Sequence, residues 1–80
     1  MINKTASEYF LERLREYMTE MGLSQNSLSL NTGIPRSTIK GWFNGIQNPG
    51  LEYLVILARF FKCSVDYLLG LEDEFGNKTC

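Results

Sequence analysis

Glycine and proline divide this sequence into short intervals, and this division restricts the chain to short helices joined by tight turns. Gly22, Gly33, Gly45 and Gly70 each follow a stretch with helical signals, and Asn48-Pro49-Gly50 has the composition of a turn. Glycine ends helices readily because it adopts the left-handed conformation without steric cost. No interval shows the alternation of apolar and polar residues that is typical of a half-buried strand. The sequence therefore predicts an all-α fold.

Five helices are expected. The first follows Thr5, which stands in capping-box spacing to Glu8, although Ser7 is an alternative N-cap. Ser24 and Ser64 are the expected N-caps of the second and fifth helices, and Pro35 stands at or beside the first position of the third. The expected helices cover residues 6–21, 24–31, 35–44, 51–61 and 65–69.

Two of these helices have faces that matter for function. The third is expected to turn Ile39, Trp42 and Phe43 inward, and its outward residues are Arg36, Ser37, Lys40, Gly41 and Asn44. The fourth has more apolar residues than one buried stripe requires. We expect its core stripe to be Leu51, Leu54, Leu57, Ala58 and Phe61, and a second stripe to be Tyr53, Ile56 and Phe60. Contiguous large apolar side chains are rarely left exposed on a monomer, so the second stripe is a candidate dimer surface. The alternative is that the fifth helix and the tail fold back over this stripe and keep the protein monomeric.

The length and composition are those of one small folded domain. The chain has 80 residues, of which 44% are apolar and 21% charged, and its net charge is −1. We expect residues 1–70 to form the domain and residues 71–80 a flexible polar tail. The mainly apolar run 54–61 is far shorter than the roughly 20 residues that span a bilayer. Because the N-terminus also has no signal-peptide pattern, a cytoplasmic protein without membrane association is expected.

The sequence contains few of the residues that catalytic and metal-binding sites use. The chain has no histidine, which excludes histidine-based catalytic triads and most zinc sites. Its two cysteines, Cys63 and Cys80, are too few for a disulfide framework, and Cys63 is expected to be a small core residue. We therefore expect no catalytic residue, no metal, no cofactor and no enzymatic activity, and the sequence indicates no small-molecule ligand.

The charges are distributed unevenly along the chain. Between residues 21 and 51 there is no acidic residue, and the only charged side chains are Arg36 and Lys40. The same stretch holds 12 Ser, Thr, Asn or Gln residues. A surface that approaches phosphates needs cations and neutral hydrogen-bond donors and excludes carboxylates. Two short helices joined by a glycine turn, with a polar and basic outer face on the second, favour DNA binding.

The order and spacing of several short motifs add a resemblance to a known family. The motifs are Gly22-Leu23-Ser24-Gln25, the segment from Thr32 to Ile39, Trp42, Gly45, Asn48-Pro49, Leu57-Ala58, and the segment from Ser64 to Gly70. Together they resemble the Cro/C1-type phage-repressor helix-turn-helix family, also called XRE-like, over residues 10–70. The resemblance implies a compact five-helix domain that binds operator DNA, usually as a homodimer.

The resemblance also implies roles for individual residues. Arg36 and Ser37 match the first base-reading positions of the recognition helix, and Lys40 and Gly41 match the later ones. Arg36 is the strongest candidate, because a guanidinium pairs bidentately with guanine O6 and N7. The resemblance assigns phosphate contacts to Gln25 and Asn44.

The chain departs from the family pattern at several positions. Gly41 has no side chain for base reading, and Ile46-Gln47 replaces a loop that is often basic. Met18 and Phe43 stand where the family often has a buried Arg–Glu pair, and such a replacement is often neutral for stability. Lys62 stands where glycine or asparagine is common, so we expect a positive φ there.

Two functions remain open from the sequence. The first is sequence-specific binding of double-stranded DNA by a small transcriptional regulator, with residues 35–44 in the major groove. The alternative is a helix-turn-helix module that binds another protein, such as an antitoxin or a regulatory adaptor. The acidic ridge of the first helix and the apolar excess of the fourth favour this alternative to some extent.

Overall fold

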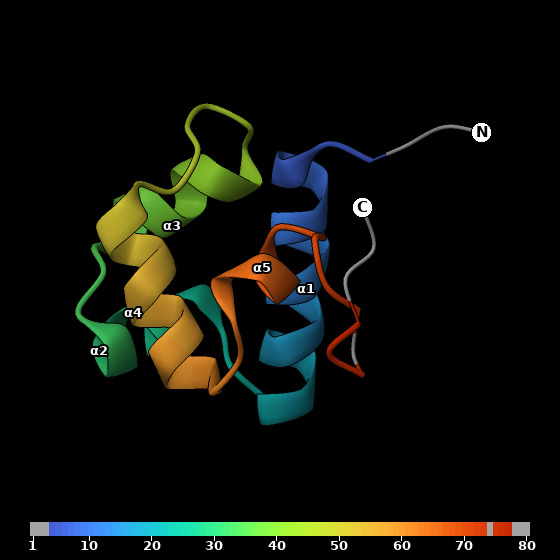
Figure 1. The fold of residues 1–80 in the computed structure, drawn as a ribbon. Helices are drawn as coiled ribbons and strands as arrows, with labels where there is room; N and C mark the ends of the chain where they lie inside the picture. The colour runs from blue at the N-terminus through green and yellow to red at the C-terminus, as the bar shows by residue number, and fades with distance from the viewer. Residues whose placement is uncertain (1–3, 74, 78–80) are drawn as a thin grey trace.

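The computed structural model describes residues 4–73 and 75–77 of the chain. Residues 1–3, 74 and 78–80 lie outside the described part, and with them Cys80 and part of the predicted tail. The described helices are α1 (Ala6–Met21), α2 (Gln25–Thr32), α3 (Arg36–Phe43), α4 (Leu51–Phe61) and α5 (Val65–Leu68) (Figure 1). This order and the compact arrangement of the helices confirm the predicted all-α, five-helix fold.

The helix ends follow the capping signals closely. Thr5 is the N-cap of α1, and its hydroxyl accepts from the Glu8 N–H while the Glu8 carboxylate accepts from the Thr5 N–H at 2.8 Å. This reciprocal pair satisfies two donors that the helix itself leaves free, and it decides for Thr5 over Ser7. Pro35 precedes α3 as its N-cap, because its ψ of 137° is extended rather than helical. At the other end α3 stops at Phe43, and Asn44 is its C-cap.

The C-terminal end of α4 has an unusual backbone. Lys62 adopts φ 58° and ψ 46°, and within the described part it is the non-glycine residue with a positive φ. The expected left-handed conformation is therefore confirmed. It costs a side-chain-bearing residue about 1–2 kcal/mol, which a glycine would avoid.

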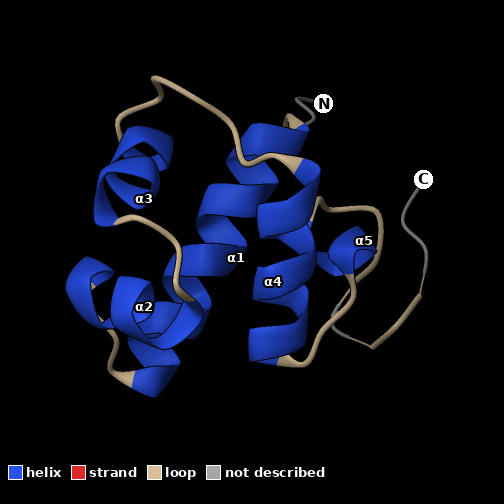
Figure 2. Ribbon diagram, turned by 90° about the vertical axis from the view of Figure 1, so that its left-hand side faces the viewer, coloured by secondary structure: helices blue, strands red, loops and turns tan. Residues whose placement is uncertain are grey.

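The helices pack around one apolar core. Figure 2 shows α2 and α3 on one side of the molecule and α5 on the other, with α1 and α4 between them. Phe10 of α1 and Trp42 of α3 meet edge-on inside the core, and Tyr17 of α1 stacks on Phe61 of α4 with 4.5 Å between ring centroids. The buried hydrophobic residues are Phe10, Leu14, Met18, Leu28, Ile34, Ile39, Trp42, Leu54, Leu57, Ala58, Phe61 and Leu68.

One expected core residue lies outside the core. Leu51 is 80% exposed, so its assignment to the buried stripe of α4 was wrong. Leu51 is the first residue of α4, directly after the turn, and Leu54 is the first buried residue of the helix. Cys63, in contrast, is half-buried and packs against the core as expected.

Two contacts pack α5 and the residues after it against α1. The Arg13 guanidinium lies 4.3 Å from the centroid of the Tyr67 ring, and Arg13 Nε donates to the Tyr67 carbonyl at 3.2 Å. Gly70 lies directly against the Tyr9 ring, where any Cβ would collide with ring carbons. These contacts hold α5 on the side of the molecule opposite α2 and α3.

Among the described helices, none combines the length and hydrophobicity that a membrane span needs.

Candidate nucleic-acid interface

The turn between α2 and α3 is fixed by side chains as well as by glycine. Gly33 adopts φ 80°, and its N–H donates to the Ser29 carbonyl at 2.9 Å. The Ser29 hydroxyl donates to the Ile34 carbonyl at 2.6 Å, and the Thr32 hydroxyl accepts from the Ile34 N–H at 3.3 Å. The Ile34 side chain is completely buried. Several contacts at the turn, and not glycine alone, therefore fix the angle between α2 and α3.

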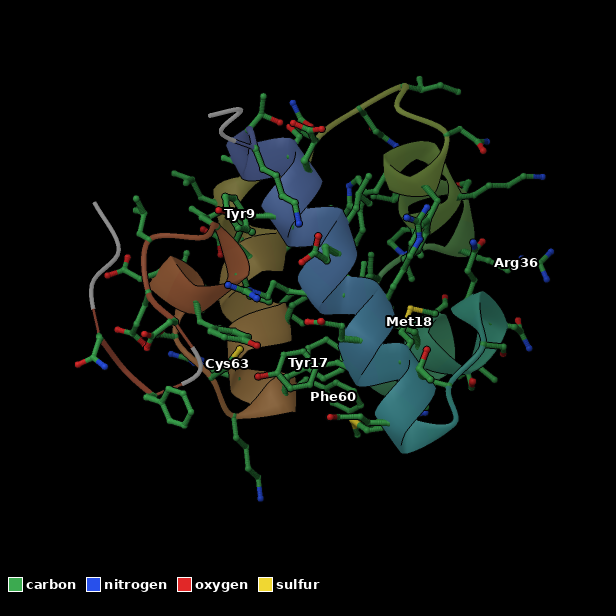
Figure 3. All side chains as sticks on the ribbon, turned by 90° about the vertical axis from the view of Figure 1, so that its right-hand side faces the viewer. Tyr9, Tyr17, Met18, Arg36, Phe60 and Cys63 are labelled. Atoms are coloured by element: carbon green, nitrogen blue, oxygen red, sulfur yellow. The ribbon has the colours of Figure 1, made fainter. Side chains whose placement is uncertain are left out.

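The third helix has one buried and one exposed face. Ile39 and Trp42 are buried in the core and anchor α3 from within. The exposed residues of the helix and of its C-cap are Arg36, Ser37, Lys40 and Asn44. In Figure 3 the Arg36 side chain points away from the helical body. The structure therefore presents four of the five residues that the sequence placed on the outward face.

The first turns of α2 and α3 form a shallow groove together. Its lining residues are Ser24, Gln25, Asn26, Arg36, Ser37 and Lys40. The structure thus brings Gln25 next to three of the predicted base-reading residues. Ser24 and Asn26 were not among the predicted site residues. The signal that could have identified them is the N-cap itself, because a helix N-terminus turns free N–H groups and a partial positive charge toward its surroundings.

The charges at this groove are not neutralised by neighbours. Within residues 4–73 and 75–77 the observed ion pair joins Lys4 and Glu12 of the N-terminal region, and neither Arg36 nor Lys40 has such a partner. Arg15 of α1 places its guanidinium 5.2 Å from the centroid of the Phe43 ring, at the end of α3. Among the described residues, Arg36 and Lys40 therefore present unpaired positive charges in the groove, and a third cation, Arg15, lies beside α3.

Gly41 does not lie on the exposed face. It is buried, and the side chain of Gln47 covers it, so the sequence-based placement of Gly41 in the outward stripe was wrong. Helical spacing put Gly41 at the edge of that stripe, beside Ser37, and the loop after α3 folds back over this edge. Helical spacing alone contains no information about such a loop.

The candidate dimer surface is less exposed than the sequence suggested. Tyr53, Ile56 and Phe60 are half-buried and pack against the core, and the Tyr53 ring lies 5.9 Å from the Trp42 ring between centroids. The apolar residues that α4 leaves exposed are instead Leu51 and Val55, the latter 41% exposed. Tyr53, Ile56 and Phe60 therefore have less free surface than the sequence suggested, and their part in a dimer stays a prediction.

The positions of the family's Arg–Glu pair are filled by apolar contacts. Met18 is buried in the core, and Phe43 is half-buried at the end of α3. Phe43 packs against the core that contains Met18, and the Arg15 guanidinium lies over the Phe43 ring. In this chain the two positions therefore contribute apolar packing in place of a charge pair.

Sequence comparison with known proteins identifies the same helix-turn-helix arrangement. A family model described as helix-turn-helix matches residues 14–68, which include all five helices at least in part. The chain belongs to the Cro/C1-type helix-turn-helix family. The predicted resemblance is thereby confirmed, and the matched family is a non-enzymatic one.

Several relatives have related sequences. The chain is 38% identical over 65 residues to the uncharacterized HTH-type transcriptional regulator YobD of Bacillus subtilis, an alignment that covers 81% of this chain and 58% of YobD. It is 36% identical to the HTH-type transcriptional regulator AnsR of the same organism, over 80% of this chain and 55% of AnsR. An uncharacterized HTH-type transcriptional regulator of Archaeoglobus fulgidus is 32% identical, with 78% of this chain and 89% of the relative covered. The chain thus spans a little over half the length of YobD and AnsR. No solved structure matches the chain with significance.

Proposed function

We propose that this chain binds double-stranded DNA sequence-specifically and acts as a small transcriptional regulator, with α3 in the major groove. The observation that carries this proposal is the groove between α2 and α3, whose two cations have no carboxylate partner in the described residues. The stretch from residue 21 to residue 51 contains no acid that would repel phosphates. The names of the relatives support the same function.

The proposed roles of the residues follow from their positions. Arg36 is exposed at the N-terminal end of α3, the end that contacts base edges in this type of DNA binding. Ser37 and Lys40 line the same groove as Arg36. Gln25 at the start of α2 and Asn44 at the C-cap of α3 contact backbone phosphates. Gly41 is excluded from side-chain contacts with bases and can contribute only its backbone.

The proposed functional unit is a homodimer on a pseudo-palindromic site. Two-fold pairing would place two copies of α3 about 34 Å apart, one turn of DNA. Leu51 and Val55 on α4 are exposed apolar residues that such pairing would cover, together with the outer edges of Tyr53, Ile56 and Phe60.

The test is selection of bound duplexes from a random DNA pool, followed by measurement of the affinity for the selected sequence. We expect one enriched motif, and an affinity for it that exceeds the affinity for a scrambled duplex by a factor of 10³ or more. Equal binding to both duplexes, or no enrichment at all, would contradict the proposal.

The alternative function is binding of another protein through an exposed apolar surface. Leu30 on α2 is 78% exposed, and Leu51 on α4 is 80% exposed. Failure of the DNA selection together with retained folding would favour this alternative, whereas an enriched motif would favour DNA binding.

A further inference from the structure

The loop between α3 and α4 places an amide over the recognition helix at the position that has no side chain. A Cβ at Gly41 would collide with Nε2 of Gln47 and lie 3.0 Å from its Cγ. Gly41 also holds the backbone of the loop close to α3, because its carbonyl accepts from the Ile46 N–H at 2.9 Å. Figure 1 shows this loop leaving the end of α3 and arching before it enters α4.

The Gln47 amide lies along α3 and remains accessible. Its Nε2 donates to the Thr38 carbonyl at 3.4 Å, a long hydrogen bond. Within the part of the chain that the structure describes, Oε1 has no hydrogen-bond partner, and the residue is exposed. The amide therefore keeps an acceptor and one N–H for an external partner.

The position of this amide relates it to the exposed face of α3. Residues four apart on a helix are neighbours, so the amide that covers Gly41 lies one helical turn along α3 from Ser37. Ser37 lines the groove with Arg36 and Lys40. The Gln47 amide therefore lies at the edge of the polar face of α3, over Gly41, although Gln47 belongs to the loop and is not itself a lining residue of the groove.

We propose that Gln47 is a specificity-determining residue of the DNA interface, and that its amide contacts a base edge in place of the side chain missing at Gly41. This inference rests on the proposed DNA-binding function. A glutamine amide pairs bidentately with N6 and N7 of adenine in the major groove. The expected consequence is a preference for adenine at one position of the bound sequence.

The same arrangement accounts for glycine inside α3. Glycine in a helix interior is about 1 kcal/mol less favourable than alanine. Here a methyl group would displace the Gln47 side chain from its place on the helix. Gly41 and Gln47 therefore act as a pair, in which one residue provides the space and the other provides the amide.

The test is selection from a random duplex pool with the parent protein and with Gln47→Ala, Gly41→Ala and the double variant. Ile46→Ala, in the adjacent and 78% exposed loop residue, is the matched control. Gln47→Ala is expected to keep the motif except at one position, where discrimination for adenine falls about tenfold. Gly41→Ala should relax the same position, the double variant should relax it no further, and Ile46→Ala should change nothing. Thermal unfolding of each variant separates these effects from loss of folding.

Three outcomes overturn the inference. In the first, Gln47→Ala selects the parent motif with unchanged discrimination. In the second, it weakens binding to all sequences equally, as loss of a phosphate contact would do. In the third, Gly41→Ala relaxes a different position from Gln47→Ala, so that the two residues do not act as a pair. If the parent protein itself enriches no motif, the proposed function fails, and this result is distinct from the other three.

Discussion

The Phe10 ring lies edge-on to the Trp42 indole, with ring centroids 5.4 Å apart and an interplanar angle of 83°. Phe10 belongs to α1 and Trp42 to α3, so this contact joins the long N-terminal helix to the proposed recognition helix. Tyr53 of α4 approaches the same indole from another direction. The exposed face of α3 is therefore positioned by aromatic contacts on its buried face.

The first prediction concerns this aromatic contact. Phe10→Leu should lower the free energy of unfolding by about 1–2 kcal/mol, because it removes an aromatic pair and part of the buried volume. Chemical denaturation measures the change. Phe75→Leu is the control, because Phe75 is 81% exposed and its replacement should change stability by less than about 0.5 kcal/mol. Similar effects of the two substitutions would contradict the assigned burial.

A second prediction concerns direct base recognition. Arg36→Ala should cost about 1–3 kcal/mol of binding free energy on the selected site and relax one base position. Arg59→Ala, which removes an exposed arginine of α4 with the same charge, should have a much smaller effect. Titration of labelled duplexes measures both. An Arg36→Ala protein that binds its best site as tightly as the parent would show that α3 is not the recognition helix.

The third prediction concerns the dependence of binding on salt. Arg36 and Lys40 lie at the groove and Arg15 beside α3, whereas Arg13 is engaged by Tyr67 on the opposite side. With about two to four phosphates neutralised per subunit, log K should fall with log salt at a slope of roughly −2 to −4 per subunit. Affinities at four salt concentrations give the slope. A value steeper than about −6 would mean that other cations contact the DNA.

The fourth prediction concerns dimerisation. If α4 is the interface, Leu51→Lys with Val55→Lys should shift the protein toward monomer in sedimentation at several concentrations, because buried like charges repel across a two-fold axis. Leu30→Lys is the control, since Leu30 is also exposed but lies on α2. A parent protein that stays monomeric at high concentration and on DNA would exclude the homodimer. A dimer that is insensitive to the double substitution would place the interface elsewhere.

The fifth prediction concerns the left-handed residue after α4. Lys62→Gly should raise the free energy of unfolding by about 0.5–1 kcal/mol, because relief of strain exceeds the added entropy of the unfolded chain. Lys62→Ala separates the backbone from the charge, since alanine keeps the strain and removes the ammonium group. Thermal unfolding of the three proteins measures the difference. If both variants changed stability equally, the backbone would not be the cause.

The helix positions and the α2–turn–α3 unit could be predicted because their signals are local. Thr5 and Ser24 carry their capping partners three residues away, and Gly33 needs no distant contact to adopt its left-handed conformation. The predicted helix ends differ from the observed ones by about one residue. Pro35 was expected at or beside the first position of α3 and proved to be the N-cap, because its ψ of 137° is extended rather than helical.

The faces of the helices could be predicted only relative to one another. The helical period shows which residues share a side, but the packing of the whole chain decides how much of that side another segment covers. That is why Gly41 proved to be covered by Gln47, Leu51 proved exposed, and Tyr53 proved half-buried. The amino-acid sequence by itself determined the helices, their caps and the acid-free stretch between residues 21 and 51, because these depend on the residues and their neighbours in the chain. The tertiary structure decided which residues of each face meet solvent, because that depends on segments that fold over them from elsewhere.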